Sequence, residues 1–326
     1  MKIDLLELLR CPKTGQRLLI EDSRNVDKDI ETGWLISEDG QHRYPIRNSI
    51  PRFVPEVNYA DNFGMQWNQF RQTQLDSHSG QSISTDRFWN ATGWQPEDLN
   101  GKWILDAGCG AGRFAEVALG AGAHVVALDY STAVDACYAN LKHHSNLHVV
   151  QGDIYALPFE LESFPFIYSL GVLQHTPDVG KAFSALPPLL QEEGSLCVDF
   201  YWKRMRTMLH MKYLLRPVTK RLPQQSLFNL LKVIVPVILP ISQVLGRIPV
   251  FGQFLKRFIP VADYTGIFPL NDQQLKEWAL LDTFDMLGPK YDNPQTVTDV
   301  TSWLKAAGLL DIEVFHGGHL VARGHK

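Results

Sequence analysis

The sequence predicts an α/β protein: a doubly wound, mostly parallel sheet of seven strands with a C-terminal antiparallel hairpin, preceded by a small N-terminal α+β module. Two stretches carry this prediction. WILDAGCGAGRFAEVALGAGAHVVALDYS, residues 103–131, has the pattern of a buried strand, a glycine-rich turn, a helix and a second strand. Near the end of the chain, DIEVFHG and HLVAR predict a hairpin through Gly317 and Gly318. Alternation of strands and helices is typical of parallel sheets covered on both faces.

Composition indicates a soluble globular protein kept in a reducing compartment. Of the 326 residues, 45% are hydrophobic and 20% are charged, as in ordinary globular domains. The four cysteines show no repeated spacing, so neither a disulfide framework nor a zinc site is indicated. Asp4 and Glu7 interrupt the N-terminal apolar run, which is therefore no signal peptide. We expect a cytoplasmic protein.

Residues 1–57 are predicted to form a module of their own, with a short helix in LLELLRCP and a closing strand in YPIRNSIPRFVP. This layout resembles the zinc-ribbon-like activator subunit of tRNA methyltransferases, in which CPxC and a later CxxC bind zinc. Here Cys11 is the only cysteine left, Thr14 stands at the second position, and residues 37–40 replace the later pair. Structural zinc needs four ligands, so we predict no metal and favour a packing or lid role over an adaptor role.

The glycine-rich turn predicts a nucleotide-type site. Glycines allow the backbone to approach a ligand, and the helix that follows offers its free amides. Asp129, about 20 residues further on, ends the second strand, where ribose hydroxyls are held in such folds. The half-fold fits a dinucleotide or S-adenosylmethionine. Asp106 would repel a pyrophosphate, and Arg113 replaces the third glycine of the dinucleotide fingerprint, so the residues favour S-adenosylmethionine.

LDAGCGAGRF also resembles the first motif of class I S-adenosylmethionine-dependent methyltransferases. The resemblance implies that Asp106 and the glycines hold the methionine end of the cofactor, Asp129 the ribose, and Asp153 with Ile154 the adenine. Residues 171–175, after the fourth strand, would line the floor of the site. The cofactor residues expected on this basis are Asp106, Gly108, Gly110, Gly112, Arg113, Asp129, Tyr130, Asp153, Ile154, Gly171 and Gln174.

The remaining strands of the sheet are expected at 147–151, 166–170 and 195–201, with helices at 131–144 and 179–186 between them. Methyltransferases of this class often cover the cofactor with a segment upstream of the first strand, and residues 58–100 are predicted to do so. Helical spacing places Phe63, Trp67 and Phe70 on one face. This segment supplies candidate cofactor or substrate contacts at Gln66, Trp67, Gln74, Asp76 and Arg87.

His175 is the only histidine in the strand-end loops. Imidazole titrates near neutral pH, so this side chain could take a proton from a nucleophile during methyl transfer. The alternative is that it only braces the loop. It is the catalytic candidate; Arg87, Tyr201, Asp285 and Tyr291 are the substrate candidates, the last two in a loop broken by proline and glycine.

Residues 202–263 are predicted to be a basic helical insert within a methyltransferase core of residues 101–201 and 264–326. No acidic residue lies between Asp199 and Asp263, whereas eleven lysines and arginines do; against a total charge of -4, the stretch 200–262 carries +11 and the rest of the chain -15. Lys232 and two prolines interrupt its apolar middle, so we expect no transmembrane span. The insert is predicted to cap a substrate that bears phosphate or carboxylate, with contact to an anionic membrane surface as the alternative.

Together these features predict methyl transfer from S-adenosylmethionine to a small-molecule acceptor that is sugar-like or lipid-linked and anionic. The order QWNQF, LDAGCGAGRF, GVLQHTPD, FDML, YDNP resembles bacterial small-molecule methyltransferases. Two alternatives stay open. An rRNA or tRNA methyltransferase is disfavoured by the missing zinc ligands and by the lack of an Asn-Pro-Pro-Tyr-type motif. A non-catalytic scaffold that binds S-adenosylmethionine is disfavoured by the intact acids and glycines.

Overall fold

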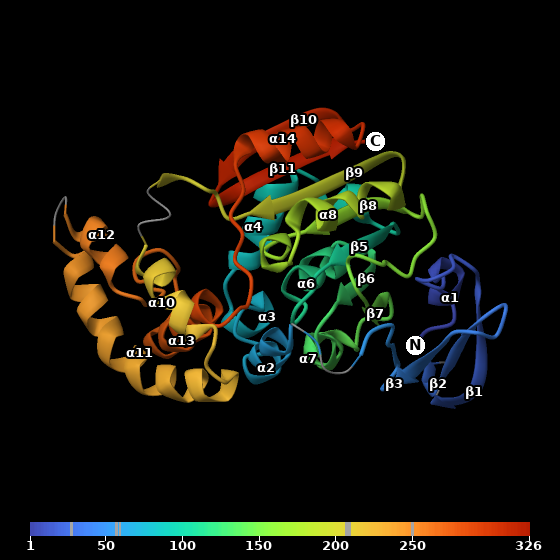
Figure 1. Ribbon diagram of the computed structural model, residues 1–326, viewed down its shortest axis with the longest axis horizontal. Helices are drawn as coiled ribbons and strands as arrows, with labels where there is room; N and C mark the ends of the chain where they lie inside the picture. The colour runs from blue at the N-terminus through green and yellow to red at the C-terminus, as the bar shows by residue number, and fades with distance from the viewer. Residues whose placement is uncertain (27–28, 56–57, 59, 206–209, 249–250) are drawn as a thin grey trace.

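A computed structural model describes residues 1–26, 29–55, 58, 60–205, 210–248 and 251–326, and these form two sheets joined by helices (Figure 1). The small sheet has the order β1-β2-β3-β4, and the large sheet has the order β10-β11-β9-β8-β5-β6-β7. The large sheet has seven strands, mostly parallel, with an antiparallel C-terminal hairpin. The predicted fold class is confirmed.

The large sheet forms where the sequence places apolar strands that end on polar residues. Parallel pairing joins β5 to β6 and β8, β6 to β7, and β8 to β9, whereas β11 runs antiparallel to β9 and β10. The fifth strand begins earlier than expected, because residues 190–194 already belong to it. The strands are β5 Trp103–Ala107, β6 His124–Asp129, β7 Leu147–Gln151, β8 Phe164–Ser169, β9 Leu190–Phe200, β10 Leu310–Gly317 and β11 His319–His325.

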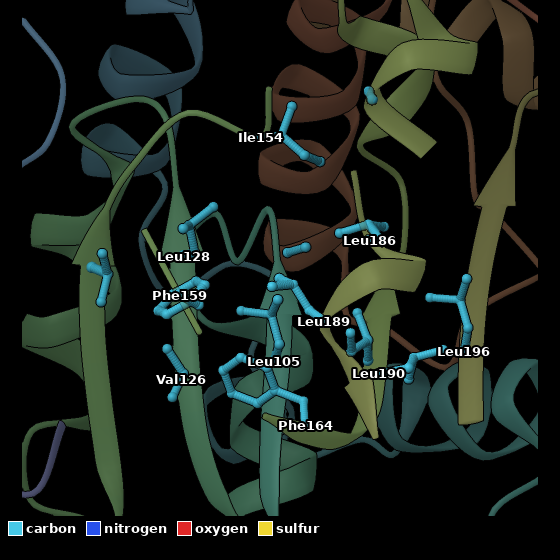
Figure 2. Packing of buried hydrophobic residues seen from close by; sticks show 14 of the residues in the cluster. Leu105, Val126, Leu128, Ile154, Phe159, Phe164, Leu186, Leu189, Leu190 and Leu196 are labelled. Atoms are coloured by element: carbon cyan, nitrogen blue, oxygen red, sulfur yellow. The ribbon is translucent and has the colours of Figure 1, made fainter. Parts of the chain in front are cut away.

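Alternate residues along these strands enter two separate cores, one on each face of the sheet. Leu105, Val126 and Leu128 lie in the core that contains Phe159 and Phe164 (Figure 2). Their neighbours along the strands, such as Ile104, Val125 and Ala127, lie in the core on the other face. Among the helices that contribute to these cores are α6 Arg113–Gly120 and α7 Ala133–Leu141 on the second face, and α8 Val179–Ser184 and α14 Val297–Ala306 on the first.

The N-terminal module packs directly on the large sheet. Its elements are α1 Leu5–Leu8, β1 Leu18–Val26, β2 Asp29–Ser37, β3 Arg43–Arg47 and β4 Ile50–Pro51. Leu5, Leu9 and Ile46 share one core with Phe159 of the methyltransferase-like part. The Phe53 amide donates to the Gln151 carbonyl at 2.8 Å, which extends the edge strand β7. The module is therefore built into the fold.

At the positions that bind zinc in the resembled family, the side chains of this module make ordinary polar contacts. Cys11 is buried, with its sulfur 3.2 Å from the Tyr44 hydroxyl. The Ser37 hydroxyl donates to Asp39 Oδ1 at 2.5 Å and accepts from the His42 amide at 3.0 Å. Among the residues that the structure describes, no group of three or more histidine, cysteine or acidic side chains is arranged to hold a metal ion.

Arg52 joins the module to the loop that follows β6. Its buried guanidinium donates to Gln151 Oε1 at 2.8 Å and to Asp135 Oδ1 at 2.6 Å, and Gln151 Nε2 donates in turn to the Tyr130 carbonyl at 3.2 Å.

We expect Arg52→Ala to lower the free energy of unfolding by about 2 kcal/mol, because Gln151 and Asp135 then lose their hydrogen bonds to the guanidinium. Denaturant unfolding would measure the loss. Arg43→Ala is the control: this arginine pairs with Glu21 at 2.6 Å but is half-exposed, so its loss should cost less than about 1 kcal/mol. Equal losses would contradict the structural role of Arg52.

Helices flank the carboxyl ends of the parallel strands. Those before the first strand of the large sheet are α2 Asp61–Gln69, α3 Asp76–Ser79, α4 Ile83–Thr92 and α5 Pro96–Leu99. A helical lobe lies at the end of the molecule opposite the N-terminal module (Figure 1). It consists of α10 Met211–Thr219, α11 Gln224–Gly246, α12 Gly252–Leu255, the 3-10 turn η3 Lys256–Phe258, and α13 Asp272–Leu287.

The structure adds to one expectation about this lobe and corrects another. Pro236 and Pro240, which interrupt the apolar run in the sequence, lie inside one continuous helix, α11, which bends along its length (Figure 1) because each proline removes a backbone donor. In the described part of the chain, α11 is the one helix long and apolar enough to cross a membrane by length and composition. The helix α13 also runs past Asp282 to Leu287, so Asp285 lies on its last turns and not in a loop.

Candidate functional site

A cavity of about 980 Å³ lies at the carboxyl ends of the parallel strands. Its walls come from the glycine turn after β5, the loops after β6, β7 and β8, the covering helices α2 and α4, the helical lobe, and the turn of the terminal hairpin. Carboxyl ends of parallel strands are where ligands bind in doubly wound folds. The predicted site residues that line it are Arg87, Gly108, Gly110, Arg113, Asp129, Tyr130, Ile154, Gly171, His175, Tyr201 and Asp285.

The glycine turn is shaped so that only glycine fits at its critical positions. Gly108 has φ +101°, and a Cβ there would lie 2.4 Å from Val172 Cγ1. Gly110 has φ +52°, and its Cβ would lie 3.2 Å from the Trp67 indole, which covers the turn. Gly112 does not line the cavity; its missing side chain makes room for Leu141 of α7. The turn therefore presents bare backbone beneath an aromatic cover.

Asp129 lies at the tip of β6 and holds this turn. Its Oδ2 accepts from the Gly110 amide at 3.0 Å, and its Oδ1 accepts from the Ser131 amide at 2.8 Å and the Ser131 hydroxyl at 2.7 Å. Each carboxylate oxygen has two lone pairs, so Oδ2 keeps the capacity to accept from one hydroxyl group of a ligand. Asp129 and Tyr130 both line the cavity, as predicted for the ribose side.

Asp106 lies behind the turn and not on the cavity wall. Burial raises the pKa of its carboxyl to about 8, and the nearby Asp129 charge adds to this. Its Oδ2 has no hydrogen-bond partner among the described residues. A buried carboxyl of this kind becomes ionised most readily when a cation approaches it.

The loops after β7 and β8 supply the next part of the wall. Ile154 lines the cavity, whereas Asp153 turns its Oδ1 to the Tyr155 amide at 2.9 Å. Gly171, with φ +80°, lines it as well. Gln174 is fully buried outside the cavity, and neither atom of its amide finds a partner within the described part of the chain. The structure thus brings Ile154 and Gly171 to the site but not Asp153 or Gln174.

His175 faces the cavity from the 3-10 turn η1 Leu173–His175. Its Nδ1 lies 3.1 Å from the Tyr291 carbonyl oxygen, which can only accept a hydrogen bond. Nδ1 must therefore carry the proton, and Nε2 of the neutral ring is left as a proton acceptor. The ring packs between Phe63 and Tyr201, at centroid distances of 5.1 and 5.4 Å. Tyr291, a predicted substrate residue, does not line the cavity and contributes its backbone carbonyl to His175.

The two arginines predicted at the site are held by other side chains. Arg113 donates to Ser84 Oγ at 2.8 Å and to Gln74 Oε1 at 3.0 Å, and burial lowers the pKa of its guanidinium to about 10. Arg87 pairs with the buried Asp199 at 2.6 Å. Of the covering-segment candidates, Gln66, Trp67, Gln74 and Arg87 line the cavity, whereas Asp76 caps α4 through the Ser84 and Thr85 amides.

Two carboxyl groups of α13 reach the cavity. Asp285 Oδ2 accepts from the Tyr201 hydroxyl at 3.3 Å. Asp282, which the sequence analysis missed, accepts from Trp278 Nε1 and Gln74 Nε2, both at 3.1 Å, and burial raises its pKa to about 6. Extending the predicted helix past residue 282 would have found it, since positions 278, 282 and 285 share one helical face.

The helical lobe adds a cationic wall, which sequence reasoning placed only as a region. Arg204, Lys212 and Arg257 line the cavity. Lys212 pairs with Asp292 at 2.9 Å, whereas Arg204 and Arg257 have no ion pair with any described carboxylate. Burial lowers the pKa of His210 beside them, and the Lys212 and Arg257 charges lower it further. This wall is suited to an anion.

Family comparisons agree with this geometry. Residues 105–198 match the family model described as "Methyltransferase domain", and residues 2–49 match the one described as "Trm112p-like protein". Both resemblances stated from the sequence are confirmed: a methyltransferase domain of the S-adenosylmethionine-dependent class, and a module like the tRNA methyltransferase activator.

Individual relatives share parts of the chain. A tRNA U34 carboxymethyltransferase of Pseudoalteromonas translucida is 33% identical over 107 residues, 32% of this chain and 33% of that protein. A sterol 24-C-methyltransferase of Saccharomyces cerevisiae is 31% identical over 201 residues, 57% of this chain and 52% of that protein. Among solved structures, a putative S-adenosyl-L-methionine-dependent methyltransferase of Methanococcus maripaludis superposes with a TM-score of 0.44 at 14% identity, over 84% of this chain and 96% of that one. The chain thus spans between about a third and a half of the length of these two curated relatives.

Proposed function

We propose that this chain, whose core is a methyltransferase domain of the S-adenosylmethionine-dependent class, transfers a methyl group to a small anionic acceptor held under the helical lobe. One observation carries the proposal. A single cavity has the glycine turn with Asp129 on one wall and the side chains of Arg204, Lys212 and Arg257 on another. A donor and an anionic acceptor would therefore meet in one cavity.

The residues present fit S-adenosylmethionine. Bare backbone at Gly108 and Gly110 accepts a closely placed ligand, and Asp129 offers oxygens to ribose hydroxyls. The Asp106 carboxyl is buried behind the turn and does not line the cavity, so its charge, and not a direct contact, would favour the ammonium group of the methionine end. When bound, the cofactor supplies a methyl group on a sulfonium centre, and the protein supplies the positioning of the two reactants.

The acceptor side combines cations with proton acceptors. Arg204 and Arg257 would bind a phosphate or carboxylate of the acceptor through charge-assisted hydrogen bonds. Methylation of a neutral oxygen or nitrogen releases a proton, and Nε2 of His175 is oriented to receive it. A sugar-like or lipid-linked acceptor with a hydroxyl or amine near its anionic group satisfies both features.

A second candidate is transfer to RNA, and the Trm112p-like module favours it, since the resembled activator serves tRNA methyltransferases. Labelled methyl transfer from S-adenosylmethionine to separated RNA, lipid and small-molecule fractions would distinguish the two. Label in an anionic small-molecule or lipid fraction supports our proposal. Label in RNA alone would replace it with the second candidate.

Neutralising the cationic wall should weaken acceptor binding and spare the cofactor. We expect Arg257→Gln to raise the KM for the acceptor roughly ten-fold to a hundred-fold, the equivalent of a lost charged hydrogen bond of about 1.5 to 3 kcal/mol. Steady-state kinetics on the labelled fraction would measure this. Lys276→Gln is the matched control, because Lys276 is exposed on α13 of the same lobe but does not line the cavity. An unchanged KM in Arg257→Gln would remove this residue from the acceptor site.

A further inference from the structure

The outer face of α11 carries a continuous apolar stripe. Six side chains recur at intervals of three or four residues, which places them on one side of the helix. Each is between 42% and 70% exposed. A single exposed aliphatic side chain is common on protein surfaces, whereas a contiguous set of them is not. They are Leu230, Val233, Val237, Ile241, Val244 and Ile248, the last just beyond the end of the helix.

The other side of α11 is fixed to the protein. Leu227, Leu231 and Val235 are buried in a core that includes Leu281 and Phe284 of α13. The helix is therefore held in place by one apolar face while a second apolar face points to solvent. One apolar face of α11 is thus buried against the protein, whereas the other has no protein packed on it among the described residues.

Exposed aromatic and aliphatic side chains continue onto the neighbouring elements of the lobe. On α10, Leu214 and Val218 are 73% and 64% exposed. On α12 and η3, which contact the end of α11, Phe254 and Phe258 are about half exposed. Exposed phenylalanines beside an apolar helix are characteristic of surfaces that enter the boundary between lipid head groups and acyl chains.

The charge of the lobe identifies what covers this face. Lys212 and Arg216 lie beside Asp292, and Lys256 pairs with Asp263 at 2.7 Å, so three of the basic residues are neutralised inside the protein. The others that face outward lie in a segment with no acidic residue from 200 to 262. The exposed ones on α10, α11 and their ends are Lys220, Arg221, Lys232 and Arg247.

We propose that the lobe of α10, α11, α12 and η3 docks on an anionic lipid bilayer, with the stripe of α11 in the interface and the basic side chains toward the head groups. Apolar side chains and unopposed cations together fit such a surface, since each alone gives weak and reversible attachment. The buried face of α11 holds the helix along the membrane surface, so that it lies on the bilayer and does not cross it.

Docking would also orient the cavity. Ile267, which is 65% exposed, lines the cavity together with Arg257 of the lobe, so the cavity opens beside the lobe. A lipid-linked acceptor could then enter with its anionic head group from the bilayer. This last step rests on the proposed function, whereas docking does not depend on methyl transfer.

Flotation of the full-length chain with vesicles tests the docking. We expect co-flotation with phosphatidylglycerol mixed into phosphatidylcholine, little with phosphatidylcholine alone, and release by high salt. The double variant Val233→Glu with Val237→Glu should lose binding at least ten-fold, and Lys220→Gln about five-fold, in line with about 1 kcal/mol for each cation near the surface. Leu19→Glu is the matched control, because Leu19 is 57% exposed on β1 of the N-terminal module and should leave binding unchanged.

Helix content by circular dichroism and S-adenosylmethionine affinity by calorimetry show whether each variant is folded, and they keep docking separate from cofactor binding. Equal binding to neutral vesicles, or full binding by the Val233/Val237 variant, would overturn the proposal. So would a dimer in light scattering that this variant dissociates, since a second copy of the chain would then be what covers the stripe. Resistance of the bound wild type to salt and alkaline extraction would show a spanning helix instead.

Discussion

Replacement of Asp129 by alanine is expected to weaken binding of S-adenosylmethionine by about a hundred-fold. The carboxylate lines the cavity at the tip of β6, where its Oδ2 can still accept from one hydroxyl of a ribose. One hydrogen bond to a charged group contributes roughly 1.5 to 3 kcal/mol. The same carboxylate also holds the Gly110 amide, so the variant loses part of the shape of the glycine turn as well. Isothermal calorimetry with the cofactor measures the loss directly.

Ser131→Ala separates the two contributions. Ser131 is buried and donates twice to Asp129 Oδ1, but it leaves the carboxylate itself in place when its hydroxyl is removed. We expect its cofactor affinity to fall less than about ten-fold, the equivalent of one lost hydrogen bond of about 1 kcal/mol. Thermal unfolding of both variants confirms that they are folded. If Asp129→Ala bound the cofactor as tightly as the wild type, the assignment of the ribose to β6 would be wrong.

The cofactor side of the site could be predicted because its geometry is local. A strand, a glycine turn and a helix follow one another within residues 103–120. Gly108 and Gly110 have positive φ angles, which glycine adopts without steric strain. Parallel strands also bring their carboxyl ends to one edge, so Asp129 and Ile154 could be placed together without knowing the rest of the fold.

The acceptor side could not be predicted in the same way, because it is assembled from distant segments. Arg257 and Asp282 line the same cavity as the loop after β8, although they are far from it in the sequence. The packing of α11 on α13 helps to place them there. Pro236 and Pro240 interrupt the apolar run of the sequence but not the helix, since burial of Leu231 and Leu239 in the core of the lobe outweighs the lost backbone bonds. The continuity of α11 therefore depends on tertiary packing, which the local sequence pattern does not contain.

The N-terminal module shows a third case. Its resemblance rested on the layout of a short helix and a closing strand, without most of the zinc-binding cysteines, and residues 2–49 match the Trm112p-like family. Leu9 and Ile46 explain why: they join the core that Phe159 and Val150 form on one face of the sheet. Apolar packing of this kind can stabilise a small module in place of a metal. Retention of the module is therefore expected to depend on its contact with the large sheet.

Replacement of His175 by alanine is expected to reduce turnover by about a hundred-fold to ten-thousand-fold and to leave cofactor affinity within a few-fold of the wild type. A positioned general base contributes an acceleration of that size. The Tyr291 carbonyl fixes the proton on Nδ1, so Nε2 is the nitrogen that can take the proton of the acceptor. Single-turnover measurement of methyl transfer, with calorimetry for the cofactor, gives both values.

His175→Asn distinguishes a base from a brace. The asparagine amide can still donate to the Tyr291 carbonyl in place of Nδ1, and so keeps the loop contact, but it has no group that accepts a proton near neutral pH. If His175 only holds the loop, asparagine should restore most of the turnover that alanine loses. If it is the base, asparagine should be as slow as alanine, and the rate of both variants should rise with pH as hydroxide replaces the missing acceptor. Near-normal turnover in His175→Ala would instead assign the proton to another group of the cavity, and Asp285, which also lines it, would be the next to replace.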